Sequence, residues 1–65
     1  MKYDFARHCY LLADDQFNEG CRNNFYNPIY AERCFERATH FYAIAELFGY
    51  TYEIHLDVEN YLAGY

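Results

Sequence analysis

Hydrophobic residues recur every three or four positions in the first third of the chain, which is the spacing of one face of an α-helix. Arg7 and Asp14 fall on the opposite, polar side of this helix. The apolar positions are Phe5, Ala6, Cys9, Tyr10, Leu12, Ala13 and Phe17. Asp4 suits the positive N-terminal end of such a helix, and Gly20 is a residue type that commonly ends one. The pattern therefore predicts a helix over residues 4–19.

A second helical pattern begins at Asn27 and Pro28. Asn favours the capping position because its side chain accepts a backbone N–H, and Pro at the first helical position loses no hydrogen bond. Apolar and small residues then continue at helical spacing, at Ala31, Cys34, Phe35, Ala38, Phe41, Tyr42, Ala45 and Phe48. Gly49 follows the last of them. We expect a helix over residues 28–48 and, because the polar segment 20–27 is short, an antiparallel hairpin with the first helix.

Residues 50–65 follow two patterns at once. Apolar and polar side chains alternate over residues 50–59, as in a half-buried strand, yet Ile54, Val58 and Tyr61 also follow helical spacing. Thr51 stands where a helix cap is expected. We prefer a helix, because a lone strand leaves its backbone groups unpaired unless a second chain pairs with it.

The predicted fold is therefore all-α, in a single domain over residues 1–65, with a hairpin and a short C-terminal helix. The alternative is an α+β fold in which a strand at 50–58 pairs across a dimer. Ile44 and Leu47 lie outside the main apolar stripe of the second helix, and we expect the C-terminal segment, or else a partner protein, to cover them. In the connecting segment, Phe25 and Tyr26 are expected to fold back onto the hairpin.

Composition and net charge limit the size of the core and the kinds of binding partner. The chain has 65 residues, so its core must be thin, and 9 Tyr and 6 Phe supply most of the large side chains. Its formal charge of −5 argues against direct binding to a nucleic-acid backbone or to an anionic membrane. Residues 38–65 carry no Lys or Arg, and their acidic residues are Glu46, Glu53, Asp57 and Glu59. The acidic character therefore belongs to the C-terminal half.

Cysteine usage and hydropathy bear on the compartment. The chain has 3 Cys, an odd number, and Cys9 and Cys34 lie in the apolar stripes, so we expect no disulfide framework. No apolar run approaches the roughly 20 residues of a membrane span, and the first residues do not resemble a signal peptide. We expect a protein of the reducing cytoplasm, which would be the host cytoplasm for a phage-encoded chain.

Residues capable of catalysis or metal binding do not form a recognisable constellation. The His and Cys residues show no ligand pair at the spacing of a zinc module; they are His8, His40, His55, Cys9, Cys21 and Cys34. Cys21, next to Arg22 in the predicted loop, is the one candidate nucleophile, but a chain this short has little room for a substrate pocket. We expect no catalysis, no metal and no cofactor.

The remaining hypothesis is a binding function. Acidic and Tyr side chains in the C-terminal half would suit a basic, Arg- or Lys-rich surface on another protein, as in small phage or plasmid inhibitors that mimic the charge of a nucleic acid. The candidate partner-binding residues are Glu46, Tyr50, Tyr52, Glu53, Asp57, Glu59 and Tyr61. The alternative is a structural homo-oligomer, at its simplest a homodimer, assembled through aromatic helix faces or through C-terminal strand pairing.

Overall fold

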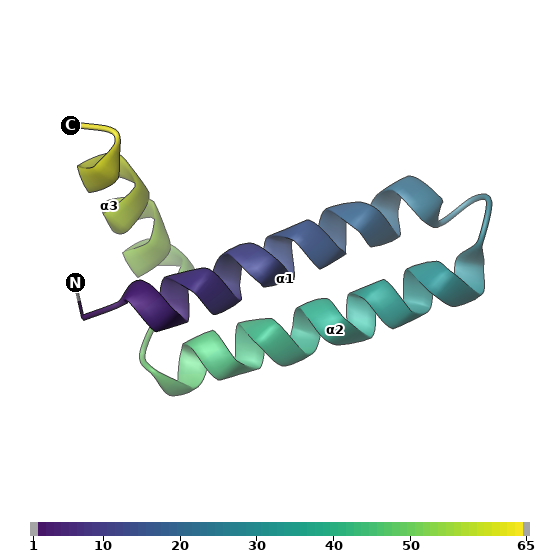
Figure 1. The fold of residues 1–65 in the computed structure, drawn as a ribbon, viewed down its shortest axis with the longest axis horizontal. Coiled ribbons are helices and arrows are strands. Elements are labelled where there is room, and N and C mark those ends of the chain that lie inside the picture. Colours follow the sequence, from purple (N-terminus) through teal and green to yellow (C-terminus); the bar gives the residue numbers. More distant parts are fainter. Residues whose placement is uncertain (1, 65) are drawn as a thin grey trace.

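The computed structural model describes residues 2–64, which form three helices: α1 (Asp4–Asn23), α2 (Pro28–Leu47) and α3 (Tyr52–Leu62). Helices α1 and α2 lie antiparallel as a hairpin, and α3 projects from the end of the hairpin at which both termini lie (Figure 1). No strand occurs within residues 2–64. The predicted all-α fold is confirmed, and the alternative of a C-terminal strand at 50–58 is wrong.

Side-chain caps define where α2 and α3 begin. The side-chain oxygen of Asn27 accepts a hydrogen bond from the Tyr30 N–H at 3.2 Å, and that of Thr51 accepts one from the Ile54 N–H at 3.4 Å. After α2 the chain turns at Gly49, whose φ of +76° is a left-handed conformation that favours glycine. Both predicted helix starts are therefore confirmed.

The end of α1 differs from the prediction, because the helix continues through Gly20 to Asn23. Gly20 is buried, and a Cβ atom at this position would lie 2.7 Å from Cε1 of the Phe35 ring. Gly20 lets an aromatic ring of α2 approach α1 closely, and it does not end the helix. The connection between α1 and α2 is correspondingly shorter, over residues 24–27 instead of the predicted 20–27.

Small side chains form the contact between α1 and α2. The buried residues of the two helices are Ala6, Cys9, Ala13 and Gly20 in α1, and Ala31, Cys34, Ala38 and Ala45 in α2. Positions 6, 13 and 20 are seven residues apart, as are 31, 38 and 45, so each set forms one narrow stripe along its helix. We call the contact between the two stripes the small-residue seam. It allows the helix axes to approach closely, because the distance between packed helices depends on the side chains between them.

The large apolar side chains predicted as core lie beside this seam. Phe5, Phe17 and Phe48 are 59%, 48% and 59% exposed. The rings of Phe5 and Phe48 meet edge to face, with centroids 5.4 Å apart. The predicted apolar faces point in the right direction, but their buried part is narrower than expected, because close-packed helices leave no room for a ring between them.

The aromatic core lies where α3 meets the N-terminal end of α1. Tyr50 is 1% exposed, and the centroid of its ring lies 5.4 Å from that of Tyr3 and 5.6 Å from that of Tyr10. The Tyr50 hydroxyl lies 2.8 Å from Nδ1 of His55, and the His55 ring stacks on Tyr10 with centroids 4.2 Å apart. These contacts anchor the first half of α3 to the hairpin.

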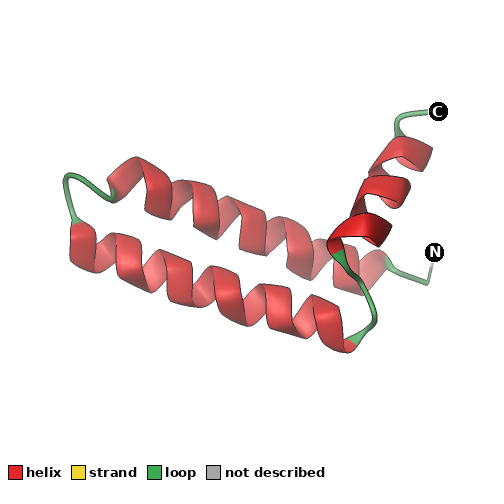
Figure 2. Ribbon diagram, turned by 180° about the vertical axis from the view of Figure 1, so that it is seen from behind, coloured by secondary structure: helices red, strands yellow, loops and turns green. Residues whose placement is uncertain are grey.

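Helix α3 packs on only one face of the hairpin, at the end that carries the N-terminal turns of α1. In Figure 2, which shows the molecule from behind, α3 lies in front of the N-terminal end of α1, whereas the face toward the viewer in Figure 1 is open. Ile44 is partly buried and packs against a cluster of Ala6, Cys9, Ala45, Tyr50 and Val58. Leu47, in contrast, is 85% exposed.

Candidate interaction surface

The outer side of α3 brings together three of the predicted partner-binding residues. Glu53, Asp57 and Tyr61 follow one another at four-residue spacing and are all exposed, Tyr61 at 72%. The buried side of α3 carries His55 and Val58. We call Glu53, Asp57 and Tyr61 the α3 column.

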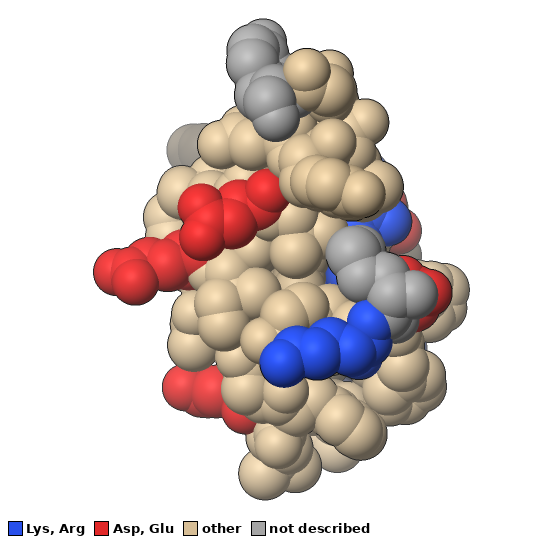
Figure 3. All heavy atoms as spheres, turned by 90° about the vertical axis from the view of Figure 1, so that its left-hand side faces the viewer, with Lys and Arg blue, Asp and Glu red and all other residues tan. Residues whose placement is uncertain are grey.

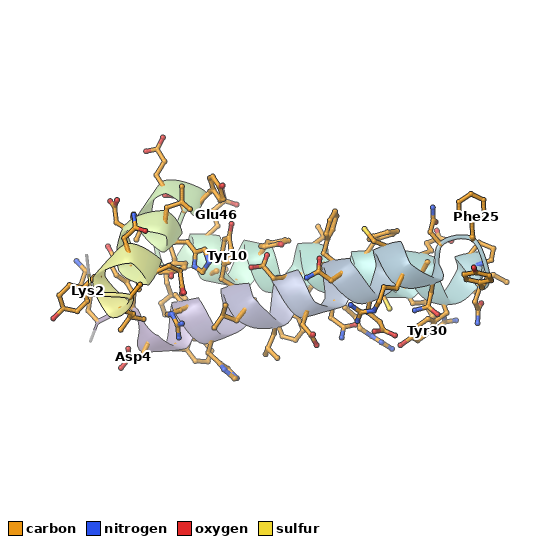
Figure 4. The ribbon with its side chains drawn as sticks, turned by 90° about the horizontal axis from the view of Figure 1, so that it is seen from above. Lys2, Asp4, Tyr10, Phe25, Tyr30 and Glu46 are labelled. Carbon is orange, nitrogen blue, oxygen red and sulfur yellow. The ribbon has the colours of Figure 1, made fainter. Side chains whose placement is uncertain are left out.

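Two further predicted residues are exposed but lie outside this column. Tyr52, at the first position of α3, is 63% exposed. Glu46 is exposed on α2 and lies at the end of the hairpin from which α3 projects (Figure 4). They extend the acidic, Tyr-rich surface from α3 toward the hairpin.

The structure removes Tyr50 from the predicted surface. Its ring is part of the core, because the turn after α2 directs it inward between Tyr3 and Tyr10. Glu59 is also occupied: its Oε1 accepts a hydrogen bond from Nε of Arg7 at 2.7 Å. That bond lowers the pKa of Glu59. Glu59 therefore ties α3 to α1 through one of its two carboxylate oxygens.

Glu53 and Asp57 have a different environment. No Lys or Arg within residues 2–64 forms an ion pair with either carboxylate. Figure 3 shows the end of the molecule that carries α3: acidic side chains protrude at the left margin of this view, while basic side chains lie nearer its centre and right. The negative charge of the α3 column is therefore not neutralised within the described chain.

Residue types used for catalysis and metal binding are scattered. Across the described chain, no three His, Cys, Asp or Glu side chains lie close enough together to hold a metal ion, and no pocket is present. All three cysteines are free thiols; Cys9 and Cys34 are buried. Cys21 is exposed and lies in the last turns of α1, whereas the sequence analysis placed it in a loop. Also within residues 2–64, no helix has the length and apolar composition needed to cross a bilayer.

Exposed apolar side chains are the feature that the sequence analysis missed. Phe25, Tyr26 and Ile29, around the connection between α1 and α2, are 96%, 90% and 71% exposed, so Phe25 and Tyr26 do not fold back as expected. Phe25 lies at the end of the hairpin opposite α3 (Figure 4). A second exposed set lies around the contact between Phe5 and Phe48. The signal for this second set is a seven-residue recurrence of large apolar residues, at 5 and 12 in α1, at 41 in α2 and at 48 directly after α2.

The fold defines this protein as a small helical hairpin with a short third helix and an acidic outer surface. Comparison of the sequence and structure with protein-family models, curated proteins and solved structures gave no match. Its function is therefore argued from the surfaces described above.

Proposed function

We propose that this chain is a non-catalytic protein-binding module whose third helix engages a basic surface on another protein. The observation that supports this most directly is the α3 column: two carboxylates without a cationic partner within residues 2–64, on a helix that projects from the hairpin. Arg or Lys side chains of a partner would supply the missing cations through charge-assisted hydrogen bonds.

The tyrosines of this surface suit the same role. Tyr61 and Tyr52 are 72% and 63% exposed, and their rings can be buried by a partner at a small cost in side-chain entropy. Tyr is enriched among the residues that dominate binding energy, and its hydroxyl can donate or accept a hydrogen bond within a polar interface. The carboxylates would set the orientation and the association rate, and the rings would supply the apolar contact.

A nucleic-acid-binding site is one kind of surface that this arrangement fits. Glu53 and Asp57 lie one helical turn apart, about 6 Å along the axis, and present negative charge in a row. By occupying a groove built for phosphates, α3 would act as an inhibitor in the manner of small phage or plasmid proteins. Its attraction to such a groove would weaken with added salt, because the screening length is about 8 Å at physiological ionic strength.

Charge reversal tests the proposal. The variant Glu53→Lys/Asp57→Lys is compared with Glu32→Lys/Glu36→Lys, which makes the same charge change at the same spacing on exposed positions of α2. Both variants are first checked for helix content by circular dichroism, and each is then used to capture proteins from lysate of the native host. We expect a protein with a basic surface to bind the wild type and the α2 control but not the α3 variant. Equal capture by all three, or equal loss in both variants, would refute the role of α3.

A further inference from the structure

One face of the hairpin has no layer over it. Helical domains bury their apolar faces between packed layers, and the two helices of the hairpin form a single layer. Helix α3 contacts one face, through Tyr10 and Arg7. Phe5 and Phe48 lie together on the other face, each 59% exposed, and no helix within residues 2–64 covers them. We call this second face the open face.

Two contacts and the helical period define the open face. The Phe5 and Phe48 rings touch near the termini, and the Tyr30 hydroxyl donates a hydrogen bond to Oε1 of Glu19 at 3.5 Å near the connection. Phe5 and Glu19 are four turns apart on α1, and Tyr30 and Phe48 are five turns apart on α2, so each pair lies on one side of its helix. The residues halfway along, Leu12 and Phe41, continue the apolar set. The open face is therefore apolar in the half nearest the termini.

The other half of the open face is charged, with opposite signs on the two helices. On α1 the stripe continues to Glu19, with Asp15 beside it toward the outer edge of the helix, and on α2 it continues through Arg37 and Arg33. No ion pair within the described residues uses Asp15, Arg33 or Arg37. Glu19 already accepts a bond from Arg22 at 2.5 Å.

The register of the hairpin places these charges at matching heights. From the Phe5–Phe48 contact, ten residues along α1 lead to Asp15, about 15 Å away, and eleven residues back along α2 lead to Arg37, about 16 Å away. Glu19 and Arg33 lie one turn further on. Acidic residues of α1 and basic residues of α2 therefore lie at similar heights along the hairpin.

We propose that a second copy of this chain covers the open face, related by a two-fold axis that runs along the length of the hairpin. This axis places α1 of one copy beside α2 of the other at the same height. The apolar halves then meet, Asp15 of each copy faces Arg37 of the other, and Glu19 faces Arg33. The product is an antiparallel four-helix bundle.

The distribution of apolar and charged residues favours this axis over a two-fold axis perpendicular to the hairpin. A two-fold axis perpendicular to the hairpin would set α1 against α1 in opposite directions. With full overlap, Phe5 would then lie over the Arg22 end of the second α1, and Phe48 would lie over the start of the second α2 near Asn27. That arrangement would bury charges against rings, which is unfavourable. The axis along the hairpin buries rings against rings and brings opposite charges together.

The open face is also large enough. A stable interface buries about 800 Å² on each partner, which is about a sixth of the 4934 Å² surface of this chain. Two helices of 20 residues give a face about 30 Å long and about 20 Å wide, and its ridged surface has a larger accessible area than this outline. The interface leaves α3 outside, on the opposite face. The dimer therefore does not depend on the proposed role of α3, but it would present two α3 columns to a partner and so raise its avidity.

Complementary charge swaps test both the dimer and its axis. The single variants Asp15→Arg and Arg37→Asp each place like charges opposite one another twice in a homodimer. In an equimolar mixture, the guanidinium that the first variant introduces on α1 faces the carboxylate that the second introduces on α2, and the untouched Asp15 and Arg37 also meet. The sample is the full chain, and the measurement is the molar mass and dimer dissociation constant by sedimentation equilibrium.

We expect the wild type to sediment at twice the chain mass at micromolar concentration, each single variant to dissociate about tenfold more readily, and the mixture to recover the wild-type constant. Glu36→Lys, on an exposed position of α2 outside the open face, is the control and should leave the constant unchanged. A monomeric wild type, or a mixture no tighter than the single variants, would overturn the proposal. The variant Glu53→Lys/Asp57→Lys should still dimerise, so a failure of the dimer can be told apart from a failure of the proposed binding role of α3.

Discussion

The small-residue seam predicts that enlarging the Ala13 side chain destabilises the fold. This side chain is 0% exposed, and Ala38 on the facing stripe of α2 is 2% exposed, so no open space lies beside it. Ala13→Leu adds three carbon atoms at the centre of the seam. The added atoms must push the helices apart or force side chains away from their preferred rotamers, since protein interiors are close-packed.

The expected loss in the free energy of unfolding follows from the absence of free space beside Ala13. Adding methylene groups to a packed core costs about 1–3 kcal/mol, and a leucine between two closely approaching helices falls at the upper end, about 3 kcal/mol. A chain of this length has a total stability of about 3–10 kcal/mol. Ala13→Leu should therefore remove a third or more of the free energy of unfolding and lower the Tm by about 10–20 °C.

Urea and thermal unfolding followed by circular dichroism at one fixed protein concentration measure this loss. The matched control is Asn18→Leu, which adds a leucine at an exposed position of the same helix and should change stability by less than about 0.5 kcal/mol. If both leucine variants unfold with the wild-type free energy, α1 and α2 do not approach closely at Ala13 and the seam is refuted.

Two other predictions concern the ends of the hairpin. Because Arg7 holds the pKa of Glu59 below its ordinary value of 4.5, the ion pair stabilises the fold above about pH 4.5 and this contribution is lost as the pH falls through the lower folded value. Urea midpoints of wild type and Glu59→Gln should therefore differ near neutrality and converge in acid; a constant difference would contradict the ion pair. Gly20→Ala should lower the Tm, although alanine is the better helix former by about 1 kcal/mol, because its Cβ would lie 2.7 Å from the Phe35 ring. A raised Tm would show that the ring moves aside freely.

Local signals in the sequence were sufficient for the helices and their starts. Asn27 with Pro28 predicts the first turn of α2, and Thr51 predicts the first turn of α3, because a cap depends on chemistry within four residues. The short polar connection then predicts an antiparallel hairpin. These features need no knowledge of tertiary contacts, and the structure confirms them.

Features set by tertiary packing were not predicted. Gly20 has the same local signature whether it ends a helix or receives a ring from another helix, and only the position of Phe35 decides between the two. Phe5 and Phe17 share an apolar face with the alanines, and the narrowness of the seam, which excludes the rings, depends on how closely α2 approaches.

The candidate surface was predicted in part for the same reason. Glu53 and Asp57 are exposed in the structure, as predicted for partner-binding residues. Tyr61 follows the helical spacing of Ile54 and Val58, yet it is 72% exposed. Tyr50 and Glu59 could not be assigned from spacing, because their partners, the Tyr3 and Tyr10 rings and the Arg7 guanidinium, come from a distant part of the chain.

The most direct measurement of the central claim is a nuclear Overhauser spectrum of the chain labelled only at alanine methyl groups and diluted with unlabelled chain. Ala6 and Ala45 belong to one buried cluster at the seam. Close packing through small side chains, with the large rings outside, predicts a cross-peak between the Ala6 and Ala45 methyls and another between those of Ala13 and Ala38. If neither cross-peak appears in the folded protein, bulky side chains separate α1 from α2, and both the seam and the open face derived from it are wrong.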